Sequence, residues 1–237
     1  MSARRAVVFG ASGGIGSAFA RQLAHEGWEV HAGGRSELGY DEDGIVPFHF
    51  DFANEASIAR AAEEIGADAI DLVFVATGLL HGDDFTPEKA WSMIDGKAMA
   101  QVLAVNTIGP ALVAKHFLGL LNRDRRSIFA ALGARVGSIG DNRLGGWHSY
   151  RASKAALVML IRDFAIELAR RNPKAIAVAL HPGTVDTTLS EPFQGNVAKG
   201  KLFTPEFSAA RLRDVIDGLE PHDNGRHIAW DGEPIPW

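Results

Sequence analysis

Tyr150 and Lys154 are the two residues whose types and spacing offer acid–base chemistry most directly. They lie four positions apart at the start of a long apolar-faced stretch, so on a helix both side chains share one face. A phenol titrates near ~10 and donates protons poorly at neutral pH, but an ammonium a few ångströms away favours the phenolate and lowers its pKa. Such a pair could act as an acid–base unit. The same spacing occurs where a half-buried tyrosine begins a helix and a lysine reaches past it to solvent, so the rest of the chain must decide between the two.

A glycine-rich turn near the N-terminus could bind phosphate. Residues 5–9 form a continuous apolar run typical of a buried parallel strand, and residues 18–24 have the pattern of a helix that ends before Gly27. Glycines between them would let backbone N–H groups and the positive end of the helix approach a pyrophosphate closely, although a tight turn without a ligand has the same local pattern. The candidate cofactor-binding residues of this turn are Gly10, Ser12, Gly13, Gly14, Ile15 and Gly16.

The residue after the second predicted strand bears on the choice of dinucleotide. The turn reads G-x3-G-x-G, whereas most two-domain dehydrogenases have G-x-G-x-x-G. A chain that binds NAD usually places an acid at the end of its second strand, to bond the ribose 2′-hydroxyl. Here residues 29–33 are followed by Gly34 and Arg35, and a guanidinium suits a 2′-phosphate. An arginine in a surface loop would look the same, but behind the glycine turn Arg35 predicts NADP(H), with NADPH preferred over NADH.

Composition excludes several classes of function. The 237 residues are enough for one large α/β domain, and the net charge of −5 gives no reason to expect nucleic acid or an anionic membrane as a partner. The sequence contains no cysteine, which excludes disulfides, thiolate metal sites and cysteine nucleophiles. The histidines have no i, i+4 pairing, so no metal site is predicted. Because the apolar run before Gly10 is too short for a signal peptide, and no run of about eighteen apolar residues follows, we expect a soluble, cytoplasmic protein.

Strand-like and helix-like patterns alternate along the whole chain. Further strands are predicted at residues 45–50, 69–76, 127–132, 175–180 and 228–230, and helices at residues 55–66, 87–121, 150–171 and from residue 204. The helix at 87–121 should be interrupted near residues 95–96 and kinked near Asn106, because Gly109-Pro110 follows. The alternation predicts an α/β fold, a single-domain, doubly wound parallel sheet (Rossmann-like) with helices on both faces, spanning residues 1–237. Ligands bind beyond the carboxyl ends of such strands, so the loops there should converge on one crevice.

Taken together, these motifs resemble the short-chain dehydrogenase/reductase family over nearly the whole chain. The finer likeness is to C-factor-like and sniffer-like carbonyl reductases, through residues 138–143, 182–187 and 229–232. The resemblance implies an oxidoreductase that transfers hydride between NADP(H) and a small carbonyl or alcohol substrate. The motifs that carry it are the glycine turn, Gly78 after the fourth strand, Asn106, Tyr150-x3-Lys154 and residues 182–187.

The resemblance also implies a role for each matching residue. Tyr150 would donate the proton to the substrate carbonyl, and Lys154 would hold the nicotinamide ribose and lower the pKa of the tyrosine. Asn106 would hold a relay water through its backbone carbonyl, and Ser138 would stabilise the developing oxyanion. The remaining implied cofactor contacts are Asp51 and Phe52 at the adenine, Gly78 by close approach, and Pro182, Gly183, Val185 and Thr187 near the nicotinamide.

Two positions depart from the family pattern. Ser138 directly follows Gly137, and alignment on that glycine places Ala134 at the family's serine position. Ser138 is nevertheless the candidate, because it is the only serine in this loop before His148. The stretch before Gly78 also lacks the asparagines that brace the sheet in the family.

The sequence is compatible with three hypotheses of function. The leading hypothesis is an NADPH-dependent carbonyl reductase, working as a homodimer or homotetramer through the apolar helices at 99–121 and 150–171. The alternative is a cofactor-binding signalling or sensor protein of the C-factor type with little turnover. An enzyme for carrier-bound acyl groups would require a basic patch near the lid expected at residues 189–203, where only Lys199 and Lys201 are found.

Overall fold

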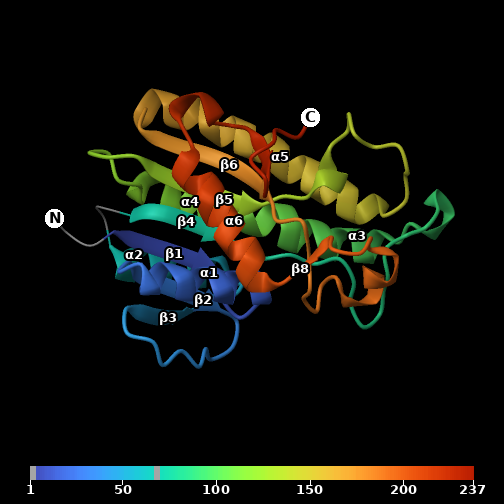
Figure 1. The fold of residues 1–237 in the computed structure, drawn as a ribbon, viewed down its shortest axis with the longest axis horizontal. Helices are drawn as coiled ribbons and strands as arrows, with labels where there is room; N and C mark the ends of the chain where they lie inside the picture. The colour runs from blue at the N-terminus through green and yellow to red at the C-terminus, as the bar shows by residue number, and fades with distance from the viewer. Residues whose placement is uncertain (1–3, 67–69) are drawn as a thin grey trace.

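The computed structural model describes residues 4–66 and 70–237 and centres on a twisted parallel sheet (Figure 1). Within the described residues the main sheet has seven strands in the order β3-β2-β1-β4-β5-β6-β9, and each neighbouring pair is parallel. The order reverses between β1 and β4, because the chain runs outward from β1 to β3 and then returns to the other side of β1. The predicted doubly wound fold is therefore confirmed, and its switch point is where open α/β sheets bind ligands. The strands of this sheet are β1 (Arg5–Phe9), β2 (Glu29–Gly34), β3 (Ile45–His49), β4 (Ile70–Val75), β5 (Ser127–Leu132), β6 (Ala175–His181) and β9 (His227–Ala229).

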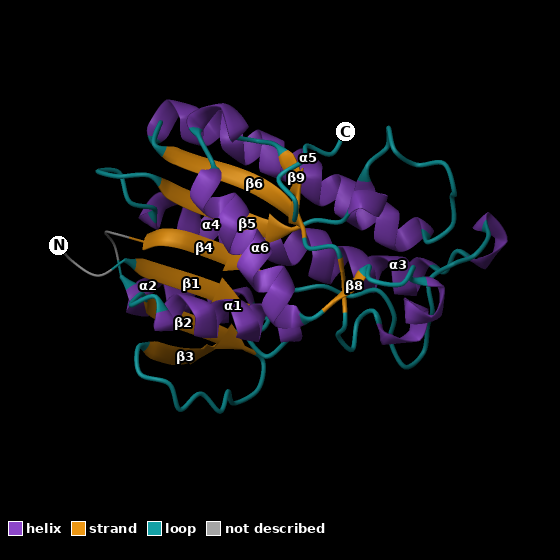
Figure 2. Ribbon diagram, in the orientation of Figure 1, coloured by secondary structure: helices purple, strands orange, loops and turns teal. Residues whose placement is uncertain are grey.

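Helices cover both faces of the sheet (Figure 2). On one face α1 and α6 bury side chains such as Phe19 and Leu212 against Phe74 of β4. On the other face α2, α4 and α5 bury Ile58, Phe117 and others against alternate residues of the same strands. Each strand thus carries apolar side chains in both directions, as the continuous apolar runs predict. The helices are α1 (Gly14–His25), α2 (Glu55–Ile65), α3 (Gly96–Leu103), α4 (Gly109–Phe117), α5 (His148–Arg171) and α6 (Pro205–Gly218).

The segment before Asn106 differs from its prediction. Residues 87–95 contain only one 3₁₀ turn, Trp91–Met93, and α3 begins where the Asp95 carboxylate accepts hydrogen bonds from two N–H groups of the first turn. A π-helical turn, Ala104–Ile108, then joins α3 to α4. Pro110 stands in the first turn of α4, where its missing N–H is accommodated, and the chain remains helical to Leu120. The π-helical turn is thus an irregularity at the place where a kink near Asn106 was predicted.

This helical stretch, Gly96–Leu120, is long and apolar enough by composition to cross a membrane. Its side chains, however, include Val113 and Phe117, which are completely buried against the sheet. It is therefore the core helix of a soluble α/β fold.

The other boundaries agree with the predictions to within two residues, except that α1 begins at Gly14, four residues before the predicted start at residue 18. The predicted fourth strand began at Ala69, which lies outside the described residues, and β4 is seen from Ile70. Helix α5 begins at His148, two residues before Tyr150, and β9 begins one residue early at His227. Two short strands, β7 (Thr184–Val185) and β8 (Leu202–Phe203), pair beyond the carboxyl end of the sheet, on the side to which the arrowheads in Figure 2 point.

Candidate active site

The glycine turn lies at the carboxyl ends of β1 and β4, and its shape depends on glycine. Gly10 has a φ of +83° and lies against the backbone of residues 76–77, where a Cβ would come within 3.1 Å. A Cβ on Gly16 would lie 2.3 Å from the Gly10 carbonyl oxygen, and one on Gly14 would lie 2.9 Å from the Thr187 methyl group. The contacts of Gly10 and Gly14 bring the turn together with the loops that follow β4 and β6. The predicted convergence of these segments is therefore observed.

The N-terminus of α1 suits an anion. None of the described side chains caps it, and its first turn contains no acidic residue. Its leading N–H groups, at the positive end of the helix dipole, therefore face the turn formed by Ser12 and Gly13 and are available to a phosphate. The Tyr40 hydroxyl donates to the Ala11 carbonyl over 2.7 Å and holds the turn in place, a support that the sequence pattern did not indicate.

The predicted adenine and ribose contacts occupy the adjacent strand ends. Arg35 follows β2 and is exposed, with no hydrogen-bond or ion-pair partner among the described residues. Asp51 accepts a hydrogen bond from the Ala53 N–H, which turns the chain after β3. The Phe52 ring packs on Phe50 and on Gly109, where a Cβ would come within 2.3 Å of it. Phe52 thus joins the adenine side of the crevice to the start of α4.

Tyr150 and Lys154 share one face of α5 and are both buried, at 9% and 2% exposure. The Lys154 ammonium donates to the Leu132 carbonyl, at the end of β5, over 2.6 Å, and lies 5.8 Å from the centroid of the tyrosine ring. The spacing that suggested an acid–base pair therefore does bring the two groups together, at the carboxyl end of the central strands.

Burial sets the protonation of this pair. It raises the pKa of Tyr150 to about 12 and lowers the pKa of Lys154 to about 7. The direction for the tyrosine is opposite to the prediction. The reason is that the ammonium donates to a backbone carbonyl and not to the phenol, so the loss of water outweighs the charge. Tyr150 thus holds its proton at neutral pH, and its burial opposes release of that proton.

Asn106 links three elements of the site. It is fully buried in the π-helical turn, and its side-chain amide exchanges two hydrogen bonds of 2.8 Å with the backbone of Leu79, just after Gly78. The amide also donates to the Ser153 hydroxyl, which in turn donates to the Tyr150 carbonyl. Because a π-helical turn shifts carbonyls out of the regular helical pattern, this residue stands where a backbone oxygen can bind water.

Glu88 fixes the start of the helix that carries Tyr150. Its buried carboxylate accepts hydrogen bonds from the N–H and the hydroxyl of Ser149, in the first turn of α5. Burial alone would raise the pKa of Glu88, but these hydrogen bonds and the nearby His148 bring it below its ordinary value. Sequence reasoning missed Glu88, because the capping residue is 61 positions away from the helix it caps.

Ser138 contacts its own loop and the C-terminal segment. Its hydroxyl donates to the Pro236 carbonyl over 2.5 Å and accepts the Asp141 N–H. It thus ties the loop to the C-terminal segment. Ala134 and Val136 from the same loop belong to the apolar cluster that contains Tyr150. The oxyanion role of Ser138 therefore stays a prediction, and Ala134 is the residue that alignment on Gly137 places at the family's serine position.

The stretch at residues 182–187 lies between the glycine turn and the lid. Gly183 has a φ of +81° and lies against the Phe203 ring, and the Pro182 carbonyl accepts the Ser208 hydroxyl of α6. Val185 is buried in β7, and Thr187 reaches Gly14. These residues therefore adjoin the pyrophosphate turn, as the predicted nicotinamide contacts require.

Apolar side chains enclose the hydroxyl end of the site. Three successive left-handed residues, at φ 63°, 67° and 50°, bring Trp147 onto Tyr150. From the lid, Phe193 packs on Trp147 with ring centroids 5.2 Å apart. The lid also touches the opposite wall, because His81 approaches the Thr188 carbonyl at 3.2 Å and Leu189 lies against Gly78. The other apolar side chains of this cluster are Leu79, Leu80, Phe85, Val102 and Val136.

Comparison with known proteins decides the family. The profile of the short chain dehydrogenase family matches residues 4–197. The chain belongs to this family. It is 30% identical over 236 residues to 1-hydroxy-2-glutathionyl-2-methyl-3-butene dehydrogenase of Rhodococcus sp. (strain AD45), which covers 98% of both chains. It is also 35% identical over 144 residues to the C-signal of Myxococcus xanthus, covering 61% of this chain and 81% of that protein.

Solved structures of short-chain dehydrogenases agree with this assignment. The NADPH-bound carbonyl reductase from chicken fatty liver superimposes with a TM-score of 0.85 at 25% identity, covering all of this chain and 95% of the other. The carbonyl reductase Sniffer of D. melanogaster superimposes with a TM-score of 0.86 at 20% identity, covering both chains completely, and supports the fold. The predicted family, with relatives of the C-factor and sniffer type, is therefore confirmed, and the protein is an oxidoreductase of the short-chain dehydrogenase/reductase family.

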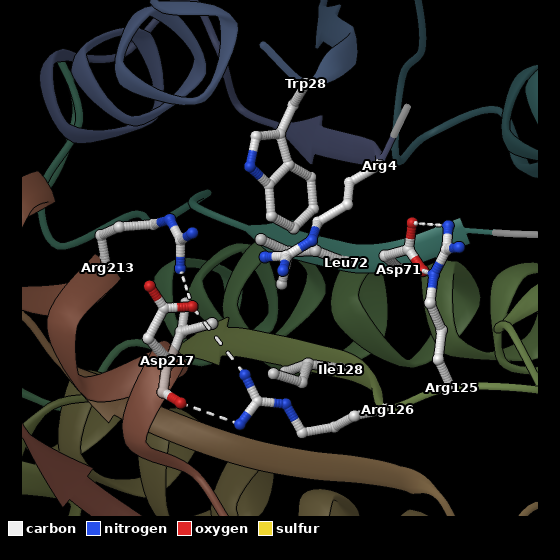
Figure 3. Close-up of a pocket in the computed structure, with 10 residues that line it drawn as sticks. Arg4, Trp28, Asp71, Leu72, Arg125, Arg126, Ile128, Arg213 and Asp217 are labelled. Atoms are coloured by element: carbon white, nitrogen blue, oxygen red, sulfur yellow. Dashed lines mark hydrogen bonds and ion pairs between the residues drawn. The ribbon is translucent and has the colours of Figure 1, made fainter. Parts of the chain in front are cut away.

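A separate hollow of about 150 Å³ lies at the opposite, amino ends of the strands (Figure 3). Arg125 binds the buried Asp71 there through two hydrogen bonds, and Arg4 and Arg213 both lie over the Trp28 ring at 5.3 Å. Arg213 is itself paired with Glu26. This hollow is thus lined by an ion-pair network, at the end of the sheet remote from Tyr150.

Proposed function

We propose that this short-chain dehydrogenase/reductase transfers hydride between NADP(H) and a carbonyl or alcohol group, with Tyr150 as the proton donor and acceptor. The observation that carries the proposal is the buried Tyr150–Lys154 pair on α5, at the same edge of the sheet as the glycine turn. Asn106 supports the pair through Ser153. In this proposal the catalytic residues are Tyr150, Lys154 and Asn106.

The cofactor proposal is supported by the residues at the turn. Gly14 and Gly16 allow a close-packed turn that a Cβ would disrupt, and the uncapped α1 offers N–H groups to a pyrophosphate. Arg35 has an uncommitted guanidinium for a 2′-phosphate, and a 25% identical carbonyl reductase of the same fold binds NADPH. When bound, NADPH supplies the hydride. The remaining proposed contacts are Ile15, Ser12, Asp51, Phe52, Gly78, Pro182, Gly183, Val185 and Thr187.

The chemistry assigned to the chain itself is proton transfer. Tyr150, which is protonated at neutral pH, gives its proton to the carbonyl oxygen in reduction and takes one from the alcohol in oxidation. In its charged form Lys154 stabilises the resulting phenolate. In this proposal Tyr150 supplies the hydroxyl donor, with Ala134 at the family's serine position when the chain is aligned on Gly137.

The lining favours an apolar substrate. The side chains around Tyr150 are aliphatic or aromatic, and Trp147 and Phe193 offer ring faces for stacking. We therefore propose aryl or extended alkyl aldehydes and ketones as substrates in preference to charged conjugates or carrier-bound acyl groups.

The proposal for the whole protein follows from the sequence expectations. We propose one cofactor-binding domain over residues 1–237, a cytoplasmic location, and a homodimer or homotetramer. Exposed apolar residues on the π-helical turn and α5 support an assembly through these helices, since Ile108 is 53% and Met159 62% exposed. Light scattering would establish the number of subunits.

A second candidate function is favoured by Ala134. Without the family's serine, and with 35% identity to the C-signal over part of the chain, a cofactor-binding signalling protein with little turnover is the alternative. The test is oxidation of NADPH in the presence of apolar aldehydes, ketones and quinones. Turnover of an apolar member supports the reductase. NADPH binding without oxidation by any member of the panel would contradict it and favour the signalling protein.

A further inference from the structure

Two buried histidines lie directly behind Lys154 and have no part in the proposed reaction so far. His227, in β9, is only 2% exposed, and neither of its ring nitrogens has a hydrogen-bond partner among the described residues. His181, at the end of β6, is partly exposed, but its Nδ1 is buried and likewise lacks a partner in the described part of the chain. Three buried ring nitrogens are thus left without protein partners.

Both rings lie on the α5 side of the sheet. His227 is paired in register with Ala179, which belongs to the core cluster on that side, and His181 follows Ala179 by two positions on the same strand face. The end of β5, on the other side of β6, also comes close to His227, because a Cβ on Gly133 would lie 2.9 Å from Nε2 of His227. Gly133 directly follows Leu132, whose carbonyl accepts the Lys154 ammonium. His227 therefore lies next to Gly133, the residue that directly follows the Leu132 carbonyl bound by Lys154.

Apolar packing alone does not explain these rings. A neutral imidazole always carries one N–H, and a buried donor without a partner loses its hydration with no compensation. Buried polar atoms of this kind are normally satisfied by internal water, which makes about three hydrogen bonds to groups that are otherwise unpaired. Lys154 has two further N–H donors beyond the one bound to Leu132, and these can bond to the same water.

Burial, with help from nearby positive charges, keeps the two rings neutral. Arg135 from the 3₁₀ turn after β5 and Lys154 from α5 face His227, while Arg135 and, beyond β9, Asp231 face His181. Burial together with the positive charges lowers the pKa of His227 to about 3 and that of His181 to about 4. A neutral imidazole accepts at one nitrogen and donates at the other, so each ring can pass a proton along a hydrogen-bonded chain.

We propose that His227 and His181, with internal water, form a proton path that links Lys154 to solvent at the outer end of β6. This inference rests on the proposed function. In each reduction the Tyr150 O–H bond breaks and the proton goes to the carbonyl oxygen. The Tyr150–Lys154 pair then regains one proton, which the water next to His227 supplies and which solvent restores through His181. The net step consumes one solvent proton, and both histidines act through Lys154 without touching substrate or cofactor.

Two substitutions of His227 test the path. His227→Phe keeps a ring and removes both nitrogens, while His227→Gln keeps hydrogen-bonding groups but cannot pass a proton by changing tautomer. We expect both to lower kcat for reduction about fivefold or more above pH 8, to increase the solvent deuterium isotope effect, and to leave the NADPH Kd and the Tm near those of the unmodified enzyme. His31→Phe, which alters a partly buried histidine on the distant β2, is the control and should leave the pH profile unchanged.

Two results would overturn the path. One is an unchanged pH profile and isotope effect in both variants of an enzyme that does reduce carbonyls. The other is a full recovery of kcat in His227→Gln, which would show that the ring serves only as a hydrogen-bonding support. A high-resolution crystal structure gives a readout independent of turnover: water bonded to His227 and Lys154 supports the path, and a dry space around the ring refutes it. Failure of the proposed function gives a different result: the unmodified enzyme itself oxidises NADPH with none of the carbonyl compounds tested.

Discussion

Gly16→Ala should disable cofactor binding because of one contact within the glycine turn. The new Cβ would lie 2.3 Å from the Gly10 carbonyl oxygen, whereas a carbon and a backbone oxygen normally come no closer than about 3.3 Å. Either the turn or the start of α1 must therefore shift by roughly 1 Å, at a cost of about 1–3 kcal/mol. The same shift moves the N–H groups that would bind the pyrophosphate. We expect NADPH to bind about 10- to 100-fold more weakly, which corresponds to ~1.4–2.8 kcal/mol.

The same turn provides graded controls for this substitution. A Cβ on Gly13 would meet no protein atom closer than 3.4 Å, so Gly13→Ala should leave the turn and the Tm unchanged and should weaken NADPH binding least of the three. Gly14→Ala should fall between the two, since its Cβ would meet the Thr187 methyl at 2.9 Å and a side chain can move more easily than backbone. Titration calorimetry with NADPH and the Tm of each variant provide the assay. Equal NADPH affinity in all three variants would refute the reasoning from close approach.

Three further changes test other parts of the site. Arg35→Ala should weaken NADPH by about 1–3 kcal/mol and NADH far less, as measured by the two Kd values, and an equal loss for both removes the case for a 2′-phosphate contact. Glu88→Ala should lower the free energy of unfolding by roughly 1.5–3 kcal/mol at pH 7, because the Ser149 donors lose a charged acceptor. This difference should shrink as the pH falls below ~4.3 and the carboxylate is protonated. Denaturation curves that show no difference at pH 7 would contradict this expectation. The unmodified protein should become more stable between pH 7 and 10, by up to ~1.4 kcal/mol per pH unit, because the folded chain releases the Lys154 proton near pH 7 and the unfolded chain near ~10.4. Lys154→Met should lack this rise in the free energy of unfolding. The same pH dependence in both proteins would show that the lysine is not desolvated.

The fold could be predicted because its signals are local. Continuous apolar runs such as residues 127–132 coincide with a strand residue for residue, and Thr204-Pro205 begins α6 with the Thr204 hydroxyl accepting the Phe207 N–H. The segment before Gly96 was wrongly predicted to be helical, because Glu88 is held by contacts with the distant Trp147 and Ser149. A π-helical turn at Asn106 likewise depends on tertiary contacts, here with Leu79 and Ser153.

The site was predictable where spacing along one element determines geometry. Tyr150 and Lys154 share a helix face, and the glycines share a turn, so their placement follows from the sequence. The contacts of Ser138 could not be predicted, because the C-terminal carbonyls that bind its hydroxyl are about a hundred residues away. The pKa of Tyr150 was predicted in the wrong direction for a related reason, since the partner of Lys154 is a carbonyl on β5 that no sequence pattern marks.

Turnover by Tyr150→Phe, measured together with NADPH affinity, tests the central claim most directly. The substitution removes one oxygen atom and leaves the ring that packs on Trp147 and Ala134. If Tyr150 is the proton donor, kcat for an apolar aldehyde should fall by about 10²- to 10⁴-fold while the Kd for NADPH stays within about twofold. A variant that reduces the aldehyde at the rate of the unmodified enzyme would contradict the assignment of the reaction to this tyrosine.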